Sequence, residues 1–77
     1  MTAQEMFEKL GYRERKDLKS YIGLIESYYK NDDEIINFYE NKEFMKTGEY
    51  DGSYSNITLK ELQAINKQIE ELGWNNE

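Results

Sequence analysis

Cysteine, histidine and proline are all missing from this 77-residue chain. Without cysteine the chain forms no disulfide and offers no thiolate to a metal, which fits a reducing compartment. Without histidine it lacks the usual general base near neutral pH and the commonest nitrogen ligand of metals. No apolar run approaches the roughly 18 residues of a membrane span, and the N-terminus lacks the basic-then-apolar order of a signal peptide. We therefore expect a cytoplasmic protein with no cofactor, no metal and no membrane contact.

Charge and tyrosine are what the chain has in quantity: the net charge is −6, and seven residues are tyrosine. Residues 1–30 carry six Lys or Arg and five Asp or Glu, a net charge of +1, so residues 31–77 carry −7. Such a field disfavours nucleic-acid binding, which requires neutralisation of phosphates, and favours either solubility or a basic protein partner. The length predicts a single small domain over residues 1–77, of low stability unless a partner supports it.

Both ends of the chain have the pattern of a capped amphipathic helix. Thr2 with Glu5, and Thr58 with Glu61, have the capping-box spacing, in which each side chain bonds the free backbone N–H of the other residue. A glycine follows each apolar stripe and ends the helix, because glycine adopts the left-handed conformation without strain. The apolar stripes are Ala3, Met6, Phe7 and Leu10 in the first segment and Leu62, Ile65, Ile69 and Leu72 in the second.

The middle of the chain is rich in β-branched and aromatic residues, which favour strands. The predicted strands are Tyr21–Tyr29, Ile35–Glu40 and Glu43–Thr47, with turns at Asn31–Glu34 and Asn41–Lys42. Short connections make them an antiparallel meander, and the two helices are expected to pack on one face of it. The predicted fold is therefore α+β, in the order α-β-β-β-α, with a three-stranded sheet.

Two details of the sheet stay open at this point. Asp51-Gly52 is a strong hairpin signal, which either starts a fourth strand at Ser53–Ser55 or only shapes the loop into the last helix. The register is the other, since a one-residue slip would exchange the two faces and change which face the helices cover. With a two-residue turn, Ile25, Phe38 and Met45 share one face, and Ile22, Leu24, Tyr28, Ile35, Tyr39 and Phe44 share the other.

The uncovered face of the sheet and the acidic turns are the candidate binding surface. Tyrosine supplies rigid contact area and a hydroxyl, so it is favoured at protein interfaces, although packing across strands explains tyrosines as well. Two glutamates facing each other across a tight hairpin cost stability, and one reason to keep them is a function that needs negative charge. The candidate partner-binding residues are Tyr21, Tyr28, Tyr39, Tyr50, Tyr54, Asp32, Asp33, Glu34, Glu40 and Glu43.

Other kinds of chemistry find little support in the sequence. There is no nucleophile elbow, phosphate-binding loop or calcium-loop order, so we expect no enzyme activity. Base stacking on an aromatic sheet normally requires a basic groove. The link between the first helix and the first strand does contain basic residues, but acidic residues interrupt them, which favours a solvated loop. These basic residues are Arg13, Arg15, Lys16 and Lys19.

The two ends of the chain, MTAQEMFEKLGY at residues 1–12 and ITLKELQAINKQIEELGW at residues 57–74, resemble short uncharacterised proteins of phages and mobile elements of Firmicutes. The resemblance covers roughly 30 residues and implies a mobile-element origin, a bacterial host and no catalytic residues. Small acidic proteins of this origin often inhibit host defence, anti-CRISPR proteins among them. We therefore expect a non-enzymatic accessory protein that binds and modulates a host protein, in its sharper form an acidic anti-defence inhibitor.

Two alternatives remain. The chain could be a self-associating structural module, a homodimer that uses its aromatic face. More distantly, its element order resembles that of the double-stranded-RNA-binding domain, which grips phosphates with lysines at the start of its last helix. Here that position reads Thr58-Leu59-Lys60-Glu61, one lysine against one glutamate, which departs from the family pattern. We expect no direct contact with nucleic acid.

Overall fold

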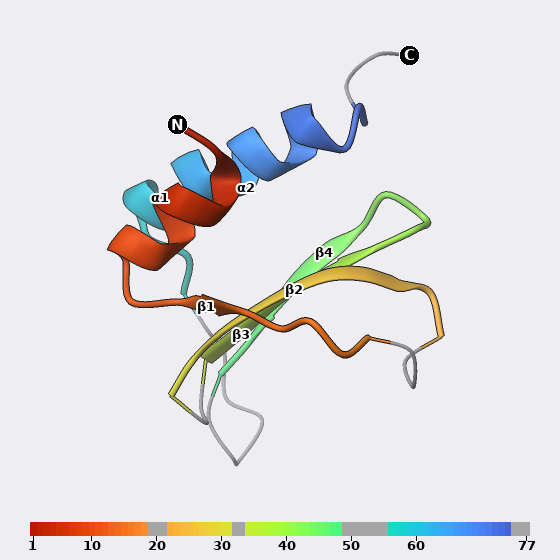
Figure 1. The fold of residues 1–77 in the computed structure, drawn as a ribbon, viewed down its shortest axis with the longest axis horizontal. Helices are drawn as coiled ribbons and strands as arrows, with labels where there is room; N and C mark the ends of the chain where they lie inside the picture. Colours follow the sequence, from red (N-terminus) through yellow and green to blue (C-terminus); the bar gives the residue numbers. More distant parts are fainter. Residues whose placement is uncertain (19–21, 32–33, 49–55, 75–77) are drawn as a thin grey trace.

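The computed structural model describes residues 1–18, 22–31, 34–48 and 56–74. Two helices lie side by side over one face of an antiparallel sheet whose four strands follow the chain order (Figure 1). The elements are α1 (Ala3–Lys9), β1 (Arg13–Glu14), β2 (Leu24–Lys30), β3 (Glu34–Tyr39), β4 (Phe44–Thr47) and α2 (Leu59–Glu71). The α+β class and the placement of both helices on one face are thus confirmed.

The sheet has one strand more than the predicted meander. The added strand is β1, which pairs Arg13 with Tyr29 and Glu14 with Tyr28. The sequence prediction of a solvated loop here was wrong, because two residues are too few to display the alternation by which strands are recognised. The chain leaves α1 beside β2, and its backbone pairs there, as the hydrogen bond from the Arg15 N–H to the Ser27 carbonyl shows (2.8 Å). Residues 53–55, the other candidate for a fourth strand, lie outside the described residues.

Both helices begin and end as their local sequence predicts. Thr2 and Thr58 form complete capping boxes with Glu5 and Glu61. At the end of each helix a glycine takes a left-handed conformation, φ 94° at residue 11 and φ 75° at residue 73. The next residue donates its N–H back to the last turn: Tyr12 to the Phe7 carbonyl (3.0 Å) and Trp74 to the Ile69 carbonyl (3.2 Å). Together with the bond from each glycine N–H to the carbonyl three residues before it, these bonds form a Schellman motif at each helix end. The motif also turns both aromatic rings back toward the core.

Replacing Thr58 by alanine should lower the free energy of unfolding by about 1 kcal/mol, because the N–H of Glu61 loses the Thr58 hydroxyl that accepts its hydrogen bond (3.1 Å). Urea unfolding followed by circular dichroism measures the change. Gln63→Ala, on the exposed side of the same helix, is the control and should stay within about 0.5 kcal/mol. Equal effects of the two changes would contradict the role of the cap.

The β3–β4 hairpin corrects the predicted register. The expected two-residue turn is a three-residue loop over residues 40–42, in which the Tyr39 N–H bonds the Glu43 carbonyl (2.8 Å) and Lys42 adopts φ 69°. This is the common hairpin in which a left-handed residue completes the loop. The extra residue shifts the pairing by one, so that Phe38 lies opposite Phe44 and both face the helices. Glu40 consequently does not face Glu43 across the turn.

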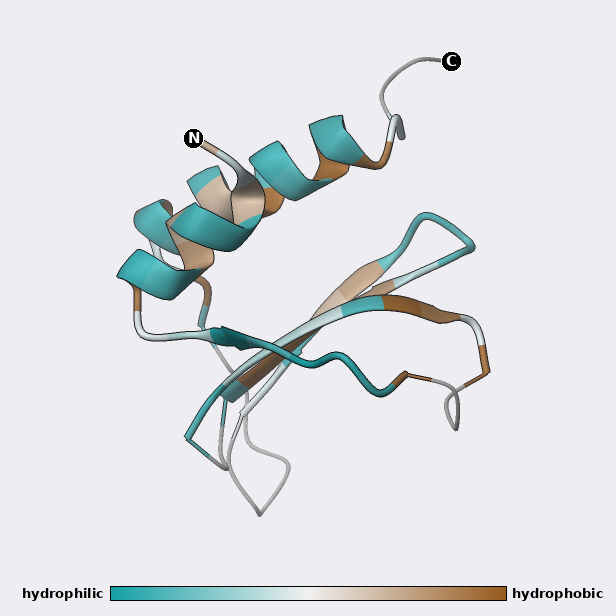
Figure 2. Cartoon of the chain, viewed as in Figure 1, coloured by the Kyte–Doolittle hydropathy of each residue, from teal (hydrophilic) through white to brown (hydrophobic). Residues whose placement is uncertain are grey.

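The core lies between the helices and the covered face of the sheet. Its densest part is aromatic: Phe7 stacks on Tyr28 with ring centroids 4.1 Å apart, and Phe38 meets both rings edge to face. Hydrophilic residues dominate the outer faces of the two helices, which are directed away from this core (Figure 2). Leu62, expected in the core stripe, is 40% exposed, because α2 turns Glu61, Ala64, Ile65 and Gln68 inward instead. The buried hydrophobic residues are Ala3, Phe7, Tyr12, Tyr28, Ile36, Phe38, Ala64 and Ile65.

Candidate functional site

Tyr28 is not part of the open surface, which corrects its place among the candidate partner-binding residues. Its side chain is 2% exposed, and its hydroxyl donates a hydrogen bond to the side-chain amide oxygen Oε1 of Gln68 in α2 (2.6 Å). The cause is the register, because Tyr28 pairs with Ile36 on the covered face. Burial and surrounding carboxylates raise the pKa of its hydroxyl above the ordinary value. Tyr28 is therefore a core residue that connects the sheet to α2.

Glu34 also has a structural role. Its carboxylate lies 4.0 Å from the Lys30 ammonium and 3.4 Å from the Lys46 ammonium. The Glu34 carboxylate is thus paired with two lysines of its own chain. Five of the other candidates lie outside the described residues, so the structure does not place them. They are Tyr21, Asp32, Asp33, Tyr50 and Tyr54.

The β3–β4 hairpin brings together candidates that the sequence predicted separately. Tyr39 and Glu43 line one hollow of about 230 Å³, together with Asn41, Phe44 and Met45. Glu40 lies beside it at the exposed tip of the loop. Met45 is 53% exposed, which is unusual for a large apolar side chain on a strand. The hollow therefore combines an aromatic ring, a flexible thioether and acidic groups, a composition that suits contact with a protein.

Polar bonds hold the side chains around this hollow in place. The Asn41 amide donates to the Glu43 carboxylate (2.5 Å), and its oxygen accepts from the Glu43 N–H (3.2 Å). On the open face, the Ser27 hydroxyl donates to the Asn37 oxygen (2.6 Å), and the Asn37 amide donates to the Tyr39 hydroxyl (3.3 Å). The tyrosine is thus positioned before any partner arrives, which reduces the entropy lost on binding.

The open face has opposite charge at its two ends. At the β1 end Arg13 pairs with Tyr29, and the Arg15 guanidinium lies 6.0 Å from the centre of the Tyr29 ring. A second hollow, of about 310 Å³, lies there and is lined by Gly11, Arg13, Tyr29 and Asn31. The hairpin end carries Glu40 and Glu43 with Lys42 between them, so its net charge is negative. Sequence reasoning missed this arrangement because Arg13 and Arg15 were assigned to a loop and not to the sheet.

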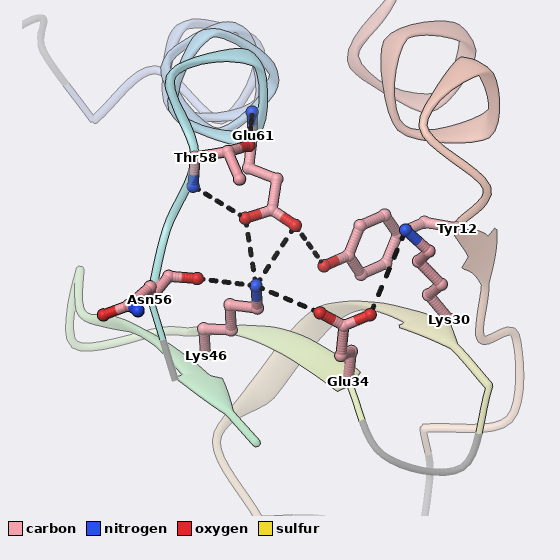
Figure 3. Close-up of polar contacts among 7 residues, drawn as sticks. All are labelled: Tyr12, Lys30, Glu34, Lys46, Asn56, Thr58 and Glu61. Atoms are coloured by element: carbon pink, nitrogen blue, oxygen red, sulfur yellow. Dashed lines mark hydrogen bonds and ion pairs between the residues drawn. The ribbon is translucent and has the colours of Figure 1, made fainter. Parts of the chain in front are cut away.

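A highly connected polar network lies on the covered face, at the start of α2 (Figure 3). The Lys46 side chain, 4% exposed, reaches the two carboxylate oxygens of Glu61 at 3.0 and 3.2 Å and the Asn56 carbonyl at 2.7 Å. The Tyr12 hydroxyl and the Thr58 N–H donate to the same carboxylate at 2.6 and 2.9 Å.

Among the described residues, every buried side-chain polar atom, those of this network included, has a hydrogen-bond partner. Although burial raises the pKa of Glu61, hydrogen bonds from Tyr12, Thr58 and Lys46 outweigh it and lower that pKa below its ordinary value. Burial and the Glu61 carboxylate raise the pKa of Tyr12. A carboxylate with a lowered pKa and hydrogen bonds from three residues suits a structural clamp between α2 and β4 better than acid–base chemistry.

The part of the chain that the structure describes contains no candidate metal cluster and no candidate membrane-spanning helix. No three of its acidic residues are grouped so that they could hold a metal ion. In the same ranges, no helix has the length and apolar character required to cross a membrane. Comparison of the chain with models of protein families, with curated proteins and with solved structures yields no match.

Proposed function

We propose that the chain is a non-enzymatic protein-binding module that contacts its partner through the hollow of the β3–β4 hairpin. The observation that carries the proposal is the meeting of Tyr39, Met45 and Glu43 at one exposed, pre-positioned hollow. Aromatic and methionine side chains are enriched at protein interfaces, which favours a binding role for this hollow. Glu40 and Glu43 suit a partner with basic residues around an apolar centre.

The resemblance of the two chain ends supports a proposal for the kind of partner. We propose an accessory protein of a phage or mobile element that binds and modulates a protein of its bacterial host, in its sharper form an acidic anti-defence inhibitor. The uneven charge of the chain supports this proposal, because a negative surface can occupy a basic groove that normally receives nucleic acid. No direct binding to nucleic acid is part of the proposal.

Truncating the two anchors of the hollow should abolish capture of the partner. We expect tagged wild-type chain to retain one host protein from nuclease-treated bacterial lysate, and the double variant Tyr39→Ala, Met45→Ala to lose at least about tenfold in affinity for it. The matched control is Leu59→Ala, Leu62→Ala, because it removes exposed apolar side chains of α2 away from the hairpin. Circular dichroism establishes that each variant is folded.

Other outcomes of this experiment would redirect the proposal. If both double variants retained the host protein equally, the hairpin hollow would not be part of the binding surface. If only the bait itself were recovered, and sedimentation velocity showed a dimer, the partner would be a second copy of the chain and not a host protein. One observation favours that second candidate: in a two-fold pairing of open faces, Arg13 and Arg15 of one copy would meet Glu40 and Glu43 of the other. Such a pairing would weaken at high salt.

A further inference from the structure

Three carboxylates gather on the covered face of the sheet, at the end opposite the Lys46 network. Glu14 pairs with Tyr28 across β1 and β2, so Glu26, two residues earlier on β2, is its diagonal neighbour on the same face. Glu71 approaches them from the last turn of α2. The sequence conceals this group, because the three residues lie on three different elements.

Glu71 also holds the two helices together. Its carboxylate accepts a hydrogen bond from the backbone N–H of Ala3 at 2.8 Å, which ties the end of α2 to the start of α1. Phe7 of α1 stacks on Tyr28 directly over the same region of the sheet. A change of charge beneath Glu71 therefore acts on the junction of both helices with the sheet.

The charged groups that act most on Glu26 are both carboxylates, Glu14 from β1 and Glu71 from α2. Glu8 of α1 adds its negative field at the neighbouring Tyr28. Burial is the largest cause that raises the pKa of Glu26, and a hydrogen bond with Glu14 is the next; together they raise it to about 7. A hydrogen bond from the backbone N–H of Ser27 acts in the opposite direction but is the smaller influence.

We propose that Glu26, the neighbour of Glu14 on the covered face, acts as a pH-sensitive latch, whose deprotonation weakens the packing of α1 and α2 on the sheet. In the protonated state the Glu26 carboxyl group donates a hydrogen bond to the Glu14 carboxylate. In the deprotonated state two negative charges lie beneath the Glu71 carboxylate and the negatively polarised end of α2. The inference does not depend on the proposed binding function.

The direction of the pH dependence follows from linkage. The folded chain holds a proton on Glu26 at pH values at which an unfolded glutamate, with an ordinary pKa near 4.3, has lost it. The stabilisation is therefore complete below the ordinary value and is lost as the pH rises through neutrality. Most paired carboxylates behave in the opposite way, because their folded pKa is lowered. The absence of histidine helps the test, since the N-terminal amine is the other group that ordinarily titrates near neutral pH.

Thermal unfolding of the full chain between pH 6 and pH 8.5 tests the latch. We expect the wild-type Tm to fall by at least about 4 °C over this range. Glu26→Gln should flatten the dependence and raise the Tm at pH 8.5 above that of wild type. Glu14→Gln should flatten it as well, because Glu26 loses its charged neighbour. Glu40→Gln, on the exposed hairpin, is the matched control and should leave the wild-type slope unchanged.

A second readout locates the effect. Hydrogen-exchange protection factors, corrected for the intrinsic effect of pH, should fall across α1 between pH 6 and pH 8.5 in wild type and stay constant in Glu26→Gln. A ¹³C-carboxyl titration of Glu26 by NMR gives its pKa directly, also if a variant folds poorly. A midpoint at or below about 4.5, or the same Tm slope in wild type and Glu26→Gln, would overturn the proposal.

Discussion

Replacing Lys46 by methionine is expected to lower the free energy of unfolding by about 3 to 5 kcal/mol. Methionine fills similar space but leaves the buried Glu61 carboxylate without its cation (3.0 Å in wild type), and breaking one side of a buried ion pair strands the other charge. A domain of 77 residues has about 4 to 11 kcal/mol of stability in total. The variant should therefore be largely unfolded at 37 °C, as circular dichroism and urea titration would record.

The exposed pair in α2 provides the control for this change. The Lys67 ammonium lies 3.4 Å from the Glu70 carboxylate, at 33% and 64% exposure, so Lys67→Met should cost less than about 1 kcal/mol. Adding Glu61→Gln to Lys46→Met should recover part of the loss, since it removes the stranded charge. If Lys46→Met and Lys67→Met were equally stable, the network would not be the clamp inferred from its geometry.

The same network sets the behaviour of the chain in acid. The pKa of Glu61 is lowered in the folded state, so its contribution to stability is present above its ordinary value and is lost as the pH falls through the folded pKa. This loss of stability in acid occurs at pH values well below the neutral range in which the Glu14–Glu26 pair acts. The two effects can therefore be separated in one series of pH-dependent unfolding measurements.

Phe7→Ala is expected to destabilise the chain by about 3 to 5 kcal/mol, the other large effect. The Phe7 ring is fully buried, stacks on Tyr28 at 4.1 Å and meets Tyr12 and Phe38 edge to face at 5.7 and 6.3 Å. Its removal leaves a cavity that a seven-residue helix cannot close, because α1 has few other anchors. Urea unfolding, with the slope checked for two-state behaviour, measures the loss.

Leu59→Ala is the matched control for the core change. Leu59 is 71% exposed near the start of α2, so its truncation should change the free energy of unfolding by less than about 0.5 kcal/mol. A Phe7→Ala variant that unfolds at the same urea concentration as Leu59→Ala would mean that α1 contributes little to the core. That result would also count against the proposed pH latch, which acts through the same helix.

The candidate site was only partly visible in the sequence. Tyr39, Glu40 and Glu43, predicted as partner-binding residues, do lie in the hairpin region, because turns tend to lie at the surface. Tyr28 was assigned to the wrong face because the register depended on one loop residue. Met45 and Asn41 were missed, since neither residue type signals binding until its neighbours in space are known.

Local sequence determines the helices at the two ends of the chain. Thr2, Thr58 and the glycines at residues 11 and 73 define helix starts and stops through contacts within six residues, so the sequence alone predicts them. Net charge, the lack of cysteine and histidine, and the α+β class also follow from the sequence. The β1 strand, the sheet register, the buried Lys46–Glu61 pair and the Glu14–Glu26 pair were decided only in three dimensions. The β1 strand and the two side-chain pairs depend on partners more than 10 residues apart, and the register of the β3–β4 hairpin depends on which face packs against the helices. Packing of the whole core, and not local sequence preference, selects these arrangements.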